Sequence, residues 1–135
     1  MIAYHGGSKT QESLLARCNR KIRINRNDME MAGIFWSTDK QVAEDFTADD
    51  LGLYQADLQF SNPLEIECDG AYWSEIPNPF KKGRTDFTDD IVLMAAKKDY
   101  DGVIFHNLIE GNNNDIISTS IVTFDPSVIK NLNSL

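Results

Sequence analysis

The chain has 135 residues, of which 41% are hydrophobic and 25% charged. That composition excludes a disordered tract, a collagen-like repeat and a coiled coil, and the length predicts a single globular domain over residues 1–135. The chain carries 13 Lys and Arg residues against 21 Asp and Glu residues, for a net charge of −8. This acidity disfavours nucleic acid as a partner, because such binding needs a basic surface.

Two elements are predicted near the N-terminus. Residues 2–5 form an apolar run that predicts a strand, and Gly6 and Gly7 end it at a turn where another group can approach the backbone closely. Residues 11–17 predict a short amphipathic helix. A local cationic patch follows, in ten positions that contain no acid: Arg17, Arg20, Lys21, Arg23 and Arg26.

Residues 33–37 predict an apolar and aromatic strand that leads into a helix. Thr38 and Gln41 have the spacing of a capping box, with Thr38 as the N-cap of a helix over residues 39–47. Residues 54–60 then alternate apolar and polar side chains, the period-2 pattern of a half-buried strand. Residues 64–68 predict another short strand.

The second half of the chain begins with an irregular loop over residues 69–87, which aromatic rings are expected to anchor. Thr88 is the predicted N-cap of the next helix, with Asp89 and Asp90 in its first turn and Lys97 and Lys98 in its last. Strands are predicted at residues 103–106 and 116–124, with a turn at 110–115. Strands outnumber helices, which favours an α+β fold with two small sheets packed face to face and helices outside.

Several kinds of chemistry find no support in the sequence. Cys18 and Cys68 are too few for a disulfide scaffold, and with His5 and His106 they have no zinc-ligand spacing. No nucleophile elbow or phosphate loop is present. The chain shows no signal peptide and no stretch of about 18 apolar residues, so we expect a cytoplasmic protein with no membrane segment and no metal.

Three segments carry a resemblance when they are taken in order: residues 4–8 (YHGGS), residues 33–37 (GIFWS) and residues 122–130 (VTFDPSVIK). Together they resemble the ADP-ribosyltransferase fold, in its diphtheria-toxin-like and poly-ADP-ribose-polymerase-like branch. Residues 58–64 and 99–105 look like segments of small members of that fold found in phages and mobile elements. The resemblance implies a split β-sandwich of two small sheets flanked by helices, with a cleft that holds NAD.

The resemblance also implies roles for particular residues. His5 would bond the ribose next to nicotinamide, and Gly6 would offer backbone hydrogen bonds to the carboxamide. Phe35 and Phe46 match two stacking aromatics, and Phe can serve there because stacking depends on the face of the ring. The NAD-binding residues implied in this way are His5, Gly6, Gly7, Phe35, Ser37 and Phe46.

The chain departs from the family pattern at the catalytic glutamate. That glutamate lies five residues before the position that matches Asp125, and Ser120 stands there. Serine cannot supply the negative charge that stabilises an oxocarbenium-like ribosyl cation. Asp115 and Glu110 are nearby carboxylates, and we select Asp115, which needs a bulge or turn to face the same side as Ser120. The predicted catalytic residues are thus His5, Asp115 and, with a water, Ser120.

Two hypotheses of function follow. The first is a mono-ADP-ribosyltransferase that transfers ADP-ribose from NAD to a protein acceptor, as a phage or mobile-element effector acting on host machinery in the host cytoplasm. The second, supported by the missing glutamate, is an inactive member that binds and regulates a protein partner. The cationic patch is interpreted first as a solvated face, with contacts to the NAD pyrophosphate or to an acidic protein as alternatives.

Overall fold

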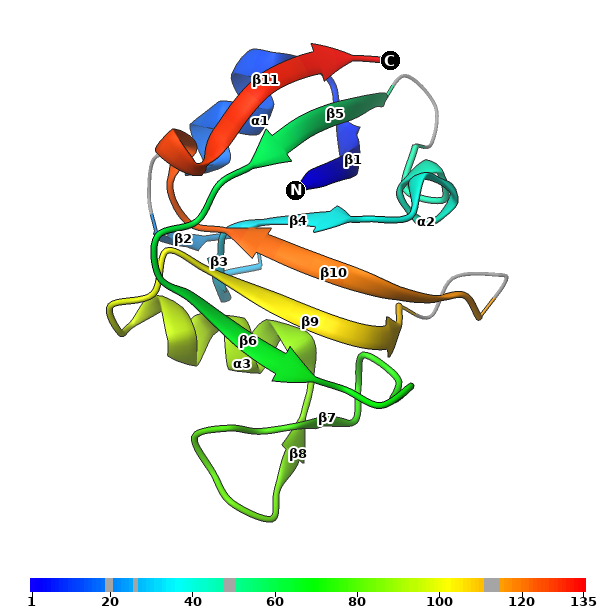
Figure 1. Cartoon of the computed structure of the whole chain (residues 1–135). Helices are drawn as coiled ribbons and strands as arrows, with labels where there is room; N and C mark the ends of the chain where they lie inside the picture. The colour runs from blue at the N-terminus through cyan, green and yellow to red at the C-terminus, as the bar shows by residue number, and fades with distance from the viewer. Residues whose placement is uncertain (19–20, 26, 48–50, 111–114) are drawn as a thin grey trace.

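A sheet of seven strands forms the centre of the molecule (Figure 1). The computed structural model describes residues 1–18, 21–25, 27–47, 51–110 and 115–135. Across the sheet the strands are β11 (Ile129–Ser134), β5 (Gly52–Leu58), β1 (Ile2–Ser8), β4 (Ile34–Ser37), β10 (Ile117–Thr123), β9 (Gly102–Ile109) and β6 (Pro63–Glu67). In the described parts of the chain, no helix is both long and apolar enough to cross a membrane.

The sheet is split between β1 and β4. These two strands are paired at a single position, Tyr4 opposite Ser37, whereas β1 pairs with β5 along nearly its whole length. The sheet therefore divides into one half made of β11, β5 and β1 and another made of β4, β10, β9 and β6 (Figure 1). The α+β class and the two-sheet arrangement are confirmed, with the two halves still joined at one residue pair.

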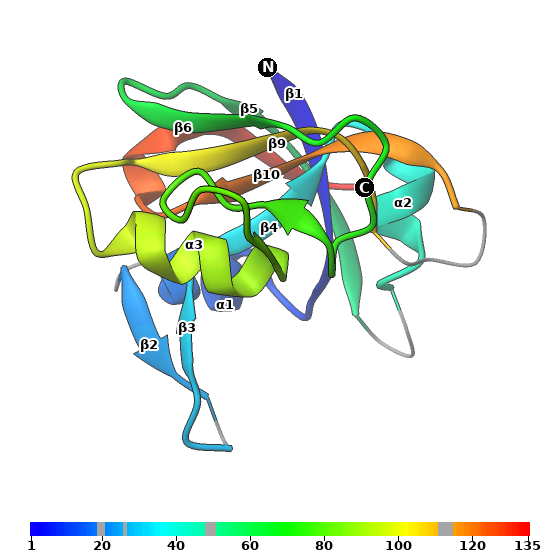
Figure 2. The same cartoon turned by 90° about the horizontal axis from the view of Figure 1, so that it is seen from below.

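Two hydrophobic cores lie on opposite faces of the larger half, because neighbouring residues of a strand point to opposite faces. On β10, Ile121 belongs to one core and Val122 to the other. Helix α1 (Gln11–Cys18) packs in the Ile121 core and helix α3 (Thr88–Ala96) in the Val122 core. In the view of Figure 2, α3 lies in front of α1. This arrangement makes the central strands β9 and β10 part of both cores.

Helix α2 (Lys40–Glu44) begins one residue later than the sequence predicts, so Thr38 is not its N-cap. Asp39 takes that position, and its side chain accepts a hydrogen bond from the Gln41 amide at 2.9 Å. The amide of Thr38 instead donates to the carbonyl of Thr119, which ties it to the β10 segment. The helix is also shorter than predicted. It ends at Glu44, whose carbonyl accepts a hydrogen bond from the Thr47 hydroxyl.

The predicted ends of α3 are also wrong. Phe87 is the N-cap residue, with no side-chain cap, and Thr88 is the first helical residue. Thr88 is buried, and its amide donates to the carbonyl of Trp73, so it is held by a tertiary contact. The helix ends at Ala96, which leaves Lys97 as the C-cap and Lys98 beyond the last turn.

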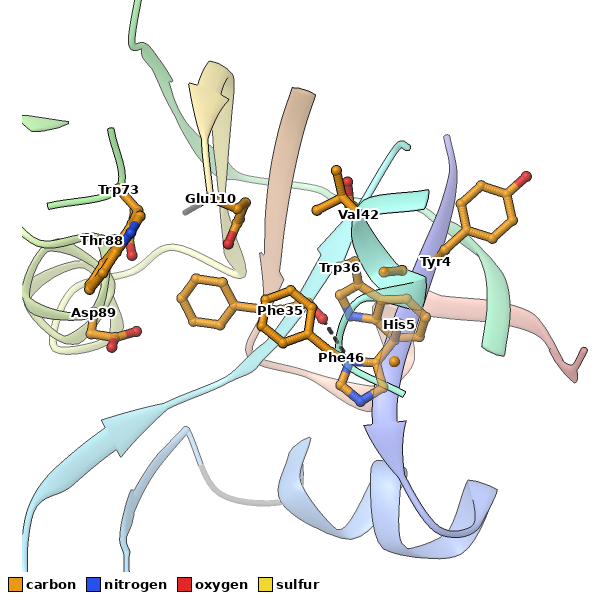
Figure 3. A pocket seen from close by; sticks show the side chains of 13 residues that line it. Tyr4, His5, Phe35, Trp36, Val42, Phe46, Trp73, Thr88, Asp89 and Glu110 are labelled. Carbon is orange, nitrogen blue, oxygen red and sulfur yellow. Dashed lines mark hydrogen bonds between the residues drawn. The ribbon is translucent and has the colours of Figure 1, made fainter. Parts of the chain in front are cut away.

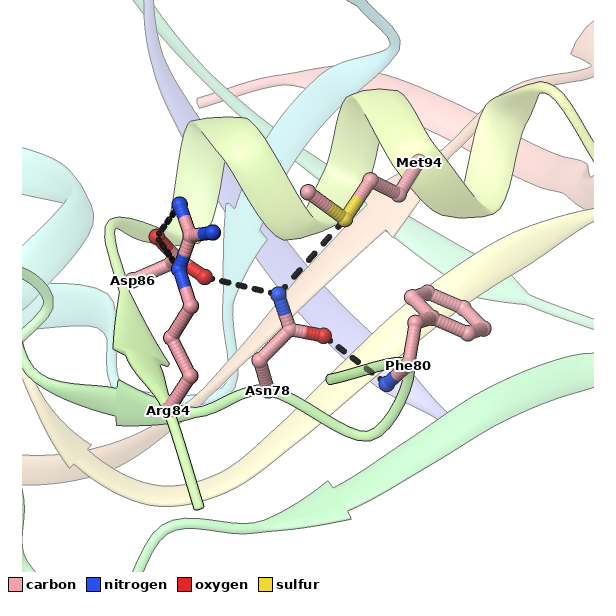
Figure 4. A network of polar contacts seen from close by, with 5 residues as sticks. All are labelled: Asn78, Phe80, Arg84, Asp86 and Met94. Atoms are coloured by element: carbon pink, nitrogen blue, oxygen red, sulfur yellow. Dashed lines mark hydrogen bonds and ion pairs between the residues drawn. The ribbon is translucent and has the colours of Figure 1, made fainter. Parts of the chain in front are cut away.

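The segment predicted as an irregular loop contains a two-stranded sheet of β7 (Ile76–Pro77) and β8 (Thr85–Asp86). The Asn78 side chain holds it, because its amide donates to Asp86 at 2.7 Å and its oxygen accepts from the Phe80 amide at 2.8 Å (Figure 4). Arg84 pairs with Asp86 on the exposed side. Trp73 packs against Phe87, which confirms that rings anchor this segment.

Three further strands, besides β7 and β8, lie outside the sequence prediction. Strands β2 (Ile22–Ile24) and β3 (Glu30–Ala32) form a second two-stranded sheet within and after the cationic patch, and β11 completes one edge of the main sheet. Of the patch, Arg20 and Arg26 lie outside the described residues.

Candidate active site

A cavity of about 370 Å³ opens where the sheet splits. The lining comes from β1, β4, α2, the start of α3, the loop between β6 and β7 and the end of β9 (Figure 3). The lining residues are Tyr4, His5, Gly6, Phe35, Trp36, Ser37, Val42, Ala43, Phe46, Trp73, Thr88, Asp89 and Glu110. In Figure 3, Trp73, Asp89 and Glu110 gather on one side, and His5 and Trp36 on the other. The structure thus brings together five of the six predicted NAD-binding residues; Gly7 does not line the cavity.

The glycine at position 6 lets helix α2 approach strand β1. A Cβ atom on Gly6 would lie 2.1 Å from the Ala43 carbonyl oxygen, a backbone atom that cannot swing aside. Gly7 has a φ of 118°, a conformation that favours glycine. The two glycines therefore place α2, with Val42 and Ala43, against the cavity.

His5 is buried and neutral, in one defined tautomer. Its Nδ1 lies 2.7 Å from the Phe35 carbonyl oxygen, which can only accept, so Nδ1 carries the proton. Its Nε2 then accepts from Arg17 Nη2 at 3.1 Å and from the Ser8 hydroxyl at 3.0 Å. Burial lowers the pKa of His5 to about 4, the Phe35 carbonyl opposes that shift and the Arg17 charge adds to it.

Aromatic side chains provide most of the apolar lining. Phe35 is half-buried and Phe46 is 50% exposed, so both rings have faces that a ligand could reach. Neighbours on a strand point to opposite faces, yet both Phe35 and Trp36 line the cavity. Both lie on β4, beside the point where β1 and β4 are paired only through Tyr4 and Ser37. The hydroxyl of Ser37 accepts from the Asp39 amide, so it supports the start of α2.

Two carboxylates line the cavity, Asp89 and Glu110, and Glu110 is the less exposed of the two. Glu110 follows the last residue of β9, and the Ser120 hydroxyl on the adjacent strand β10 donates to its Oε1. Burial and then the nearby charge of Asp89 raise the pKa of Glu110 to about 7. Asp89 is an exposed residue. Its own pKa is raised, first by desolvation of its carboxylate and then by the nearby charge of Asp90.

The structure does not bring Asp115, the selected carboxylate, to the cavity. Asp115 is exposed, has a φ of 47° and is not among the lining residues. A register shift between Ser118 and Ser120 does interrupt the pairing of β10 with β9, as a bulge would. It is Glu110, on the other strand, that lies beside Ser120.

Three lining residues have other interpretations in the sequence. The sequence predicts Trp73 as a ring that anchors a loop, Thr88 as a helix N-cap and Asp89 as an acidic residue in the first turn of that helix. No spacing signal links them to His5, which lies more than sixty positions away. Only the packing of α3 and its preceding loop against the larger half of the sheet brings them to the cavity.

His106 lies away from this cavity, on β9, where its Nε2 contacts Glu65 on β6 at 3.0 Å. That contact joins β9 to the neighbouring strand β6. Within the described ranges no three His, Cys, Asp or Glu side chains come close enough to hold a metal ion.

Comparison with known proteins agrees with the resemblance. No curated protein and no solved structure matches the chain. The family described as "ADP-Ribosyltransferase in polyvalent proteins" matches residues 1–134, nearly the whole chain. ADP-ribosyltransferases use NAD as their substrate, and the expected ADP-ribosyltransferase-like fold is confirmed by this match together with the split sheet. The chain therefore belongs to this family of ADP-ribosyltransferases.

Proposed function

We propose that the protein is a mono-ADP-ribosyltransferase that cleaves the bond between nicotinamide and ribose in NAD and transfers ADP-ribose to a protein. The observation that supports this most is the combination, in one cavity, of aromatic faces and a half-buried carboxylate. Phe35 and Phe46 offer the faces, and Glu110 the carboxylate. An acceptor in a host cell, reached by a phage or mobile-element effector, remains part of this proposal.

In this proposal each lining residue has one task. Nicotinamide packs between the rings of Phe35 and Phe46, where its flat apolar faces are removed from water. The Gly6 backbone bonds the carboxamide. His5 bonds the adjoining ribose through Nε2, and a ribose hydroxyl then replaces the Ser8 hydroxyl as a donor to that nitrogen. Ser37 holds the start of α2 beside this site.

The chemical step breaks the bond from ribose C1′ to the nicotinamide nitrogen. Both electrons of that bond go to the nitrogen, so a cationic leaving group departs as neutral nicotinamide and C1′ becomes cationic. The ionised Glu110 carboxylate stabilises this cation, an electrostatic effect that commonly contributes two to three orders of magnitude in rate. An acceptor lone pair then bonds to C1′, and the acceptor proton leaves to Glu110 or to water.

Glu110 takes the place of the glutamate that the family pattern has at Ser120. Ser120 retains a role, because its hydroxyl orients Glu110 Oε1 across the two strands. The raised pKa means that Glu110 is only partly ionised at pH 7. Activity should therefore increase with pH through about 7, as the carboxylate loses its proton.

The second candidate function is that of an inactive member that binds and regulates a protein partner. Ser120 at the usual glutamate position favours it. The two candidates differ in turnover, since both can bind NAD but only the transferase releases nicotinamide.

The test is nicotinamide release from labelled NAD, and label transfer in a bacterial lysate, by wild-type protein, Glu110→Gln and Asp115→Asn. Glu110→Gln keeps the shape of the side chain but not its charge, and should lose about 100-fold or more of the rate. Asp115→Asn removes an exposed carboxylate in the same part of the chain and should retain the rate.

Each outcome decides between the candidates. Loss of rate in Asp115→Asn but not in Glu110→Gln would return the catalytic role to Asp115. Binding of NAD without nicotinamide release at any pH from 6 to 9 would instead support the regulatory candidate.

A further inference from the structure

Two arginines of the cationic patch contact strands that border the cavity, although neither lines it. Arg17, on α1, donates from Nη2 to His5 Nε2 and contacts the Ser8 hydroxyl. Arg23, on β2, donates from Nη1 to the Gly33 carbonyl at 2.8 Å. Gly33 is two residues before Phe35, whose carbonyl accepts from His5 Nδ1 (Figure 3). A continuous set of contacts thus joins both arginines to the cavity wall.

These two cations have no anionic partner in the parts of the chain that the structure describes. The ion pairs there involve other basic groups: the N-terminal amine, Arg84, Lys97 and His106. Each guanidinium has five N–H donors, but the contacts of Arg17 use Nη2 and that of Arg23 uses Nη1. Burial and then the charge of Arg23 lower the pKa of Arg17, as expected for like charges held near each other.

Holding two half-buried cations together without a counter-charge is unfavourable for the folded protein by itself. A bound anion with several oxygens would remove that cost and satisfy the remaining donors, because guanidinium groups bind phosphate oxygens in a bidentate manner. The position of this anion would be beside His5, the residue proposed to bond ribose.

We propose that Arg17 and Arg23 bind the diphosphate group of NAD. The inference rests on the proposed function for its ligand. It gives the two arginines a role in binding substrate, in place of the first interpretation of the cationic patch as a solvated face. A large acidic partner is less suitable, because both side chains are half-buried and their contacts run inward, to His5 and to the Gly33 carbonyl.

The test is calorimetric titration of the full chain and three variants with ADP-ribose, inorganic pyrophosphate and nicotinamide. The variants are Arg17→Met, Arg23→Met and, as a matched control, Arg84→Met, which removes an exposed arginine that does not line the cavity. We expect the first two to bind ADP-ribose and pyrophosphate at least about tenfold more weakly than wild type, the loss typical of one charged hydrogen bond. Nicotinamide has no phosphate, so its affinity in Arg23→Met should stay that of the wild type.

Arg17→Met also removes a donor to His5, so Arg23→Met decides the result if the first variant does not fold. Equal ADP-ribose affinity in Arg23→Met and Arg84→Met would overturn the inference, and so would a wild-type protein that binds neither ADP-ribose nor pyrophosphate. The proposed function fails by a different observation, the absence of nicotinamide release from NAD. Pyrophosphate binding can be lost in Arg23→Met whether or not that release occurs.

Discussion

Glu110 and His5 line the same cavity, and burial shifts the pKa of each toward its neutral form. The pKa of Glu110 rises to about 7 and that of His5 falls to about 4. Both residues gain one specific contact that a neutral side chain can keep, with Ser120 and with Phe35 respectively. Near pH 6 these two side chains therefore add little charge to the cavity, which Asp89 also lines.

These shifts predict opposite effects of pH on stability. Between pH 4.5 and 7 the folded chain retains a proton on Glu110 that the unfolded chain has lost, so this residue lowers the free energy of unfolding as pH rises. His5 does the reverse, because from pH 6.5 down to 4 only the unfolded chain binds its proton. The stability of wild type relative to Glu110→Gln should thus fall by about 2–3 kcal/mol from pH 4.5 to 7.

Urea unfolding of the two proteins from pH 4 to 8 measures that difference. Because His5 is present in both, its contribution cancels. A difference that does not change with pH would contradict the raised pKa of Glu110.

Among the elements, helix α2 shows how a local signal and a tertiary contact compete for one position. Thr38 and Gln41 have the spacing of a capping box, yet the amide and hydroxyl of Thr38 both donate to the Thr119 carbonyl. Asp39 is then the residue free to accept from the Gln41 amide. The helix that carries Val42 and Ala43 into the cavity wall consequently starts at Lys40.

Asp39→Ala is expected to lower the free energy of unfolding by about 1 kcal/mol, the usual cost of removing an N-cap side chain. Thr38→Ala is the matched variant and should cost less, because the Thr38 hydroxyl contact is long, at 3.4 Å. Chemical denaturation of both variants measures the difference. A larger loss in Thr38→Ala would show that Thr38 caps the helix after all.

At the scale of the whole molecule, the two cores share strands β9 and β10. Trp36 lies in one core, where its Nε1 donates to Thr123, and Trp73 packs against the other. Since the shared strands cannot separate without opening both cores, we expect the two cores to unfold together.

The two tryptophans allow this to be measured. Trp73→Phe leaves Trp36 as the fluorescent reporter of one core, and Trp36→Phe leaves Trp73 as the reporter of the other. In each variant the fluorescence transition in urea should coincide with the loss of far-ultraviolet circular dichroism, as in a two-state protein. Separate transitions within one variant would mean that the core around the remaining tryptophan unfolds independently of the rest of the chain.

The sequence alone determined those features that depend on a few neighbouring residues. Side-chain alternation placed β5, and apolar runs placed β4, β9 and the first part of β1, which continues through Gly6 and Gly7 to Ser8. These signals are local, because strand periodicity and backbone turns act within a few positions. The resemblance to ADP-ribosyltransferases, carried by the segments around His5 and Phe35, pointed to one wall of the cavity.

The tertiary structure alone decided the rest. Glu110, and not Asp115, reaches the cavity because of how β9 and β10 pair, and Trp73 and Asp89 arrive from a different part of the chain with α3. Whether Arg17 meets solvent or His5 likewise depends on where α1 packs. Such placements result from burial and pairing between segments distant in sequence, and no local pattern in a single chain specifies which of several carboxylates or cations will be enclosed.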